Sequence, residues 1–169
     1  MSTRADRREI MARAIHERYR ESQLGLKPPD DPAMQPWEAL AEHLRESNRQ
    51  QADKIEATLR QIGCGMRPAA GRAPAPFRFT DEEVEVMASM AREHWVAERR
   101  RAGWVSGPER DVARKITPYL DLSYADLPED VKEWDRQAVR AIPEVLAAAE
   151  LEVYRLGEAE TSLVASQAH

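Results

Sequence analysis

The chain has 169 residues, of which 42% are hydrophobic and 33% charged, with 25 basic and 30 acidic side chains. This length fits one medium domain or two small ones, and such a composition excludes a disordered chain. The apolar runs are short and broken by charge, and none follows the charged N-terminus, so the sequence predicts neither a membrane span nor a signal peptide. Because Cys64 is the single cysteine, an internal disulfide and a thiolate-built metal site are excluded, and we expect a cytoplasmic protein.

The net charge of −5 hides a difference between the two halves of the chain. Residues 1–78 carry 14 basic and 11 acidic side chains, and residues 79–169 carry 11 basic and 19 acidic ones. The halves therefore have charges of +3 and −8, and opposite signs favour attraction between them. The negative total argues against long nucleic acids as partners, because these require a basic surface.

The first half of the chain predicts two amphipathic helices joined by a turn-rich loop. Apolar side chains recur at helical spacing over residues 10–19 and again over residues 44–62. Between them, residues 24–32 are rich in turn-forming residues, and residues 36–40 suit a single helical turn. Residues 63–77 contain three glycines and three prolines without an amphipathic period, so we expect a linker there.

The second half predicts three further helices. Thr80 and Glu83 have the spacing of a capping box, which opens a helix with one apolar face that stops near Gly103. A short charged helix is expected from about Arg110, and a last helix after Pro128, which a second proline kinks or restarts. Because no run alternates apolar and polar residues for long enough to form a convincing strand, the sequence predicts an all-α fold.

The two halves resemble each other in sequence. Residues 37–50 align with residues 124–137 at an offset of 87, and residues 11–19 align with residues 87–95 at an offset of 76. The difference of 11 corresponds to a longer loop in the second copy. Chance resemblance between amphipathic helices is the alternative, but repeated helical pairs usually bury their apolar faces against each other. We therefore expect two helical repeats, related by a pseudo-two-fold axis and packed as one globule.

Three motifs follow one another in the second copy. Residues 91–95 (Ala-Arg-Glu-His-Trp) end a helix on an aromatic ring, residues 103–111 (Gly-Trp-Val-Ser-Gly-Pro-Glu-Arg-Asp) form a loop, and residues 127–135 (Leu-Pro-Glu-Asp-Val-Lys-Glu-Trp-Asp) open another helix. In this order they resemble the ryanodine-receptor (RyR) repeat domain, which occurs in tandem in those calcium channels and in bacterial and phage proteins. The first copy is similar to a variant that ends some bacterial nucleotide-binding transport regulators, although it lacks the Gly-Trp loop. The resemblance implies a first RyR-like repeat, a linker, a second RyR-like repeat and a polar C-terminal tail, at residues 1–65, 66–78, 79–157 and 158–169.

The resemblance also implies a ligand. Family members are thought to bind nucleotides or nucleotide-derived molecules, as modulators in channels and as sensors of signal nucleotides in bacterial or phage defence. In tandem members the base lies in the cleft between the copies, clamped by the aromatic residues that end each first helix, which here are Tyr19 and Trp95. Stacking on an aromatic face contributes about 1–3 kcal/mol per base. Both rings also suit ordinary core packing, so the residues leave two interpretations open.

Polar side chains share a helix face with each of these two rings. His16 and Arg92 precede the rings by three residues, and Gln23 and Arg99 follow them by four. The two arginines suit phosphates, which they bind through forked hydrogen bonds. His16 suits a base edge, a phosphate or simple packing.

Three further residues complete the expected ligand site. Arg110 lies in the Gly-Trp loop and is the best single candidate for a phosphate. The matched Asn48 and Asp135 suit a base edge, a ribose hydroxyl or a buried hydrogen bond. The arginines that follow them, Arg49 and Arg136, are explained without a ligand by ion pairs with a glutamate of the same helix.

The sequence predicts no catalytic residue, no metal site and no cofactor. It lacks the GxxxxGK and GxGxxG phosphate motifs, and Cys64 has no neighbouring base. We therefore expect a sensor or sequestering protein for a nucleotide-type small molecule, with neither long nucleic acid nor membrane as partner. A second copy of the chain or an effector protein is a further candidate partner. The alternative is a ligand-free interaction or assembly module that uses the same groove.

Overall fold

The computed structural model describes residues 3–157, which form two compact units. Unit 1 contains residues 3–78 and 141–157, and unit 2 contains residues 79–140. Unit 2 is therefore an insertion into unit 1 along the chain. The expected polar tail, residues 158–169, lies outside the described residues.

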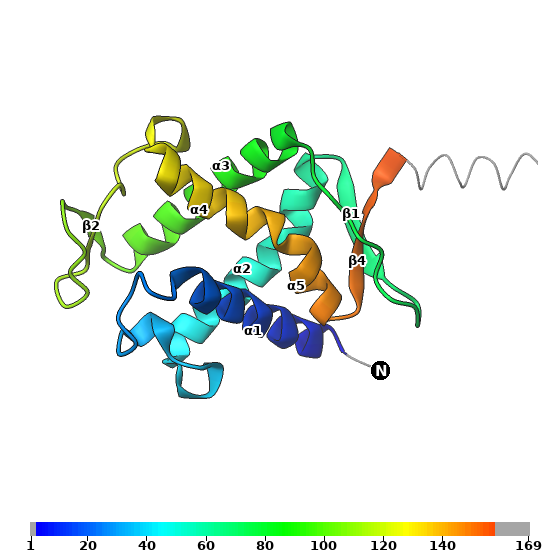
Figure 1. Ribbon diagram of the computed structural model, residues 1–169, viewed down its shortest axis with the longest axis horizontal. Coiled ribbons are helices and arrows are strands. Elements are labelled where there is room, and N and C mark those ends of the chain that lie inside the picture. The colour runs from blue at the N-terminus through cyan, green and yellow to red at the C-terminus, as the bar shows by residue number, and fades with distance from the viewer. Residues whose placement is uncertain (1–2, 158–169) are drawn as a thin grey trace, which may run out of the picture. The chain divides into compact units, whose positions relative to one another are not determined.

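Two long helices form the body of unit 1 (Figure 1). The helices and the short 3-10 turns between them are α1 (Arg4–Gln23), η1 (Pro32–Met34), η2 (Trp37–Ala39) and α2 (Glu42–Gln61). Ala12 of α1 forms a buried cluster with Trp37 and Leu40, which places η2 over the helix pair. Both helices and the turn at residues 36–40 lie where the apolar spacing predicts them, so this part of the prediction is confirmed.

A strand pair and a short helix complete unit 1. Strand β1 (Cys64–Pro68) pairs antiparallel with β4 (Leu151–Arg155), and Met66 lies opposite Val153 at the centre of the register. Helix α5 (Ile142–Ala148) packs against both α1 and β4. Segments from the two ends of the described chain therefore lie side by side in unit 1 (Figure 1).

Unit 2 pairs one long helix with one shorter helix. Its elements are α3 (Asp81–Arg101), β2 (Val105–Ser106), β3 (Ile116–Thr117), η3 (Tyr124–Asp126) and α4 (Glu129–Arg140). The predicted capping box is confirmed, because Glu83 N donates to Thr80 Oγ1 and Thr80 N donates to Glu83 Oε1. The predicted helix from Arg110 is wrong, because Asp111 and Ile116 exchange two backbone hydrogen bonds and close a tight turn instead.

The expectation that the two repeats build an all-α fold is wrong. The structure is mixed α and β, with the antiparallel pair β1–β4 and the parallel pair β2–β3. These strands have five or two residues, too few for an alternating pattern to stand out. Strand β1 is stabilised by β4, which comes far later in the chain, and β1 lies in the glycine-rich stretch that predicts a linker.

The offset of 87 that relates the two halves in sequence also relates their elements. Adding 87 to the bounds of η2 gives η3, and adding it to the bounds of β1 gives β4. The positions just before the two strands share a left-handed backbone, with φ of +73° at Gly63 and +59° at Glu150. The repeat is therefore visible in local geometry as well as in side chains.

Glu150 is a position where a substitution should stabilise the protein. Left-handed backbone costs a residue with a Cβ about 1–2 kcal/mol, and glycine is the usual residue just after a helix in this conformation. We predict that Glu150→Gly raises the free energy of unfolding by about 0.5–1 kcal/mol, measured by urea denaturation. Gly63→Ala should lower it by about 1–2 kcal/mol through backbone strain alone, since a Cβ there meets no atom within 4 Å. Glu150→Ala is the control, and a gain equal to that of Glu150→Gly would contradict the strain explanation.

Candidate functional site

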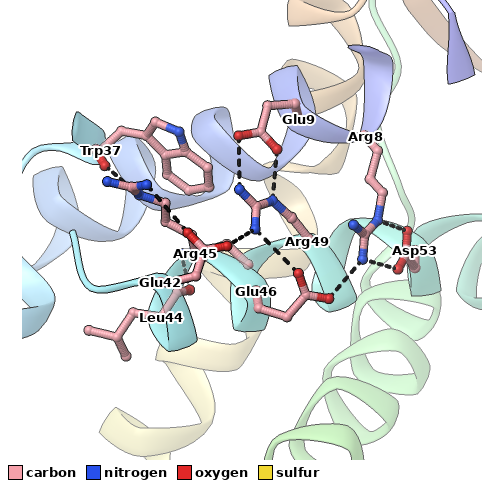
Figure 2. Close-up of polar contacts among 10 residues, drawn as sticks. Arg8, Glu9, Trp37, Glu42, Leu44, Arg45, Glu46, Arg49 and Asp53 are labelled. Atoms are coloured by element: carbon pink, nitrogen blue, oxygen red, sulfur yellow. Dashed lines mark hydrogen bonds and ion pairs between the residues drawn. The ribbon is translucent and has the colours of Figure 1, made fainter. Parts of the chain in front are cut away.

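A carboxylate-bound arginine connects the two helices of unit 1 (Figure 2). The guanidinium of Arg49 on α2 donates to both carboxylate oxygens of Glu9 on α1, at 2.7 and 3.1 Å. It also donates to Glu42 at 2.6 Å and Glu46 at 3.3 Å on its own helix. Only 15% of the Arg49 side chain is exposed, and its guanidinium lies 5.7 Å from the centre of the Trp37 ring. We call this set the unit 1 clamp.

Unit 2 contains the same arrangement. Arg136 on α4 donates to Glu85 on α3, and to Glu129 and Glu133 of its own helix at 3.0 and 3.5 Å. The phenol of Tyr124 in η3 donates to Glu85 at 2.9 Å. Burial, together with this bond, raises the pKa of Tyr124 to about 12.

We call Arg136, Glu85, Glu129 and Glu133 the unit 2 clamp. Each of its residues corresponds to a residue of the unit 1 clamp at one of the two sequence offsets, 76 or 87. Glu9 corresponds to Glu85 at 76, and Arg49 to Arg136 at 87. The ion pairs with Glu46 and Glu133 confirm that Arg49 and Arg136 are explained without a ligand. Sequence reasoning missed Glu9 and Glu85, which match when the alignment at offset 76 is extended by two residues.

An aromatic and cationic cluster lies along α3 in unit 2. The guanidinium of Arg92 is 4.6 Å from the centre of the Trp95 ring, and that of Arg99 is 5.8 Å from it. Arg99 is also 5.2 Å from the ring of Trp104, so it lies near both tryptophans. We call Arg92, Trp95, Arg99, Trp104 and Asp135 the tryptophan cluster.

Asp135 joins the cluster through a buried ion pair. Arg92 Nε donates to Asp135 Oδ2 at 2.9 Å, and the two side chains are 8% and 16% exposed. Burial raises the pKa of Asp135, although the neighbouring Arg92 opposes this effect. Arg92 is therefore bound to a carboxylate of its own unit, and the guanidinium of Arg99 lies near both tryptophan rings of the cluster.

The corresponding residues of unit 1 are held by uncharged contacts. Buried His16 places Nε2 2.6 Å from the carbonyl oxygen of Gln35, and its ring packs at a tilt against Trp37. Asn48 is buried and donates to the carbonyl of Leu44 in its own helix at 3.0 Å. His16 and Asn48 therefore occupy the positions of Arg92 and Asp135, and each of them contacts a backbone carbonyl instead.

The remaining expected site residues lie in different settings. Lys27, which sequence reasoning missed, donates to the Tyr19 hydroxyl and lies 4.8 Å from the centre of its ring. Gln23 is buried at the end of α1, and its amide donates to Ser22 Oγ at 3.4 Å. Arg110 is exposed, next to the turn closed by Asp111. Among the expected residues, the structure thus brings together four in unit 2, which are Arg92, Trp95, Arg99 and Asp135.

Two searches of the described residues bear on other kinds of site. Residues 3–157 contain no group of three or more histidine, cysteine, aspartate or glutamate side chains placed to hold a metal ion. Within the same range, each helix is too short or too polar to cross a membrane.

Comparison with known proteins matches the second half of the chain to a family. Residues 78–155 match the family model described as the RyR domain. This range contains all of the tryptophan cluster and the unit 2 clamp, and also α5 and β4, which pack in unit 1. No curated protein matches the chain.

The carboxylates of the two clamps should make folding sensitive to acid. Bonds to Arg49 lower the pKa of Glu9, and bonds to Arg136 lower those of Glu85 and Glu129, below their ordinary values. A carboxyl group with a lowered pKa stabilises the folded state above its unfolded pKa of about 4.3, and this contribution is lost as pH falls through the folded value. We predict a fall in the urea midpoint between about pH 5 and pH 3, opposed in part by Asp135, whose pKa is raised.

Arg136→Gln tests the source of this pH dependence. Without the guanidinium, Glu85 and Glu129 titrate near their ordinary values, so the variant should lose less stability between pH 5 and pH 3 than the original protein. An unchanged slope in this variant would mean that other carboxyl groups carry the effect.

The pair Arg92 and Asp135 should show strong energetic coupling. Asp135→Asn leaves a buried guanidinium without a counter-charge, and Arg92→His leaves a buried carboxylate without one. The double variant has the residue types of His16 and Asn48 at these two positions. Its loss in free energy of unfolding should be smaller than the sum of the losses in the single variants. We predict a coupling of about 0.5–3 kcal/mol from urea denaturation of the four proteins. Additive losses would show that the two residues act independently.

Proposed function

We propose, on the premise that residues 78–155 form a RyR domain, that the chain binds a nucleotide or a nucleotide-derived signal through the tryptophan cluster. The observation that carries this proposal is the position of Arg99, a residue of α3 in the matched domain, beside the rings of both Trp95 and Trp104. An aromatic face and a neighbouring guanidinium are the two groups needed for a base and a phosphate.

The chemistry divides between the two arginines. Arg92 is paired with Asp135 and lies against the Trp95 ring, so it orients this ring. The guanidinium of Arg99 binds a phosphate of the ligand. The base of the ligand stacks on one of the two indole rings that Arg99 lies beside. Asp135, with its side chain 16% exposed, accepts a hydrogen bond from a ribose hydroxyl or an exocyclic amine.

We also infer that residues 3–68 are a second, divergent RyR-type repeat, outside the range that the family model matches. The two clamps support this inference, since all three of their glutamates correspond in position. Cytoplasmic signalling, as a sensor or as a protein that sequesters its ligand, is the role that fits a binding domain of this kind. A part in bacterial or phage defence belongs to the same proposal.

Ligand binding is testable by thermal unfolding of the full chain with ATP, ADP-ribose and cyclic di- and oligonucleotides. A ligand present at about 100 times its Kd adds roughly 2.7 kcal/mol to the free energy of unfolding and raises Tm. We expect at least one nucleotide to raise Tm, and Arg99→Gln and Trp95→Ala to remove the shift.

Trp134→Ala is the matched control, because Trp134 is 49% exposed on α4 and lies outside the cluster. It should keep the ligand-induced shift. If no nucleotide changes Tm, the proposal fails and the ligand-free interaction module is favoured. If a shift persists in Arg99→Gln, the binding site lies elsewhere.

A further inference from the structure

The loop between α3 and η3 exposes an unusual share of apolar surface. Of the eight large hydrophobic side chains that are exposed in residues 3–157, four lie in this loop: Val105, Val112, Tyr119 and Leu122. Val105 is 56% and Val112 44% exposed. Apolar side chains gathered on one exposed segment are typical of an interaction surface.

The backbone of this loop holds these side chains in place. Val105 N donates to the carbonyl of Lys115 at 2.9 Å, and Lys115 N donates to that of Val112 at 3.2 Å. Gly107 packs so closely that a Cβ there would lie 2.3 Å from Ile116 Cγ2. The apolar side chains are therefore presented by a bonded framework.

Two residues of the loop have a backbone conformation that is costly for them. Lys115 has a φ of +55° and Tyr119 a φ of +65°, in the left-handed region that favours glycine. Such strain persists where the surrounding structure enforces it, and it is concentrated at functional sites. Both side chains are exposed, and Lys115 Nζ donates to the carbonyl of Ala102 at the end of α3 at 2.8 Å.

The same region is positively charged in a negatively charged chain. Residues 99–122 carry six basic and three acidic side chains, whereas the rest of the chain carries 19 basic and 27 acidic ones. Arg114 is 79% exposed and only loosely paired with Asp111, at 3.7 Å. Arg101 donates to the carbonyl of Ala97 in its own helix, and within residues 3–157 no carboxylate forms an ion pair with it. A surface that combines apolar side chains with these cations suits a partner that has an anionic surface and an apolar interior.

We propose that this basic loop surface, made by Val105, Val112, Arg101, Arg114 and Lys115, binds the face of an anionic lipid bilayer. Within unit 2 the loop projects from the C-terminal end of α3, beyond the helix pair (Figure 1). Projecting side chains can enter a fluid interface, whereas peptide recognition uses a groove or a sheet edge. Aliphatic side chains are also unsuited to stacking on nucleic-acid bases. The surface borders the tryptophan cluster at Trp104 but shares no residue with it, and its binding of a bilayer goes beyond the proposed function.

Long-range repulsion does not prevent this contact. Charges more than about 10 Å from the bilayer are largely screened at 0.1 M salt, so the loop cations act locally while the acidic remainder is shielded. Attraction to anionic lipids weakens as salt rises, because the surface potential falls off within the same distance. Salt-sensitive binding is therefore the expected signature.

The test is co-sedimentation of the full chain with vesicles of phosphatidylcholine alone or mixed equally with phosphatidylglycerol. We expect binding to the mixed vesicles, at least tenfold weaker binding to the neutral ones, and release as salt is raised. Arg101→Glu with Arg114→Glu should reduce binding at least tenfold. Val105→Thr with Val112→Thr, which keeps side-chain shape, should reduce it several-fold.

Lys54→Glu with Arg60→Glu is the charge-matched control on α2, and it should bind as the original protein does. Thermal unfolding of every variant checks that it is folded. Absence of binding to mixed vesicles, equal binding to neutral vesicles, or full binding by the loop variants would each overturn the proposal. Binding to poly-glutamate but not to vesicles would replace the lipid with an acidic protein segment.

Discussion

In each unit, one arginine and three glutamates from two helices form the interaction on which the fold depends. Arg49 and Arg136 are largely buried, and each reaches carboxylates on its own helix and on the helix packed against it. The glutamates are 39–74% exposed, so water weakens each single ion pair, and the set stabilises as a network around one guanidinium. In unit 1 the ring of Trp37 in η2 lies beside the guanidinium of Arg49, and in unit 2 Tyr124 of η3 donates to Glu85. The same set of residues therefore also holds the short turn between the two helices of each unit. Helix spacing and turn position are thus determined together.

Local sequence signals were sufficient for much of the fold. The helices, the turn at residues 36–40 and the capping box at Thr80 depend on residues within one or two turns of each other. Strand β1 was not predictable in this way, because its partner β4 comes from the far end of the described chain. Glu152 illustrates the difficulty, since this buried acidic residue in β4 is paired with arginines from β1 and the segment after it.

The candidate site was predictable in its residues but not in their pairing. Helical spacing placed Arg92, Trp95 and Arg99 on one face of α3, and the structure brings them together. The sequence could not show that Arg92 is bound to Asp135, because that contact depends on how α3 and α4 pack. At the same two positions unit 1 has His16 and Asn48, so both copies keep buried polar residues there but differ in what these residues bond.

The insertion of unit 2 into unit 1 has a consequence for biosynthesis. A ribosome completes residues 79–140 before it makes α5 and β4, which belong to unit 1. The nascent chain therefore contains every residue of the inserted unit while the first unit still lacks its closing helix and strand. Domains that are contiguous tend to fold in the order in which they are made, with the N-terminal one first. In this chain α1 lacks the cover of α5, and β1 lacks its partner strand, until residue 155 has been synthesised.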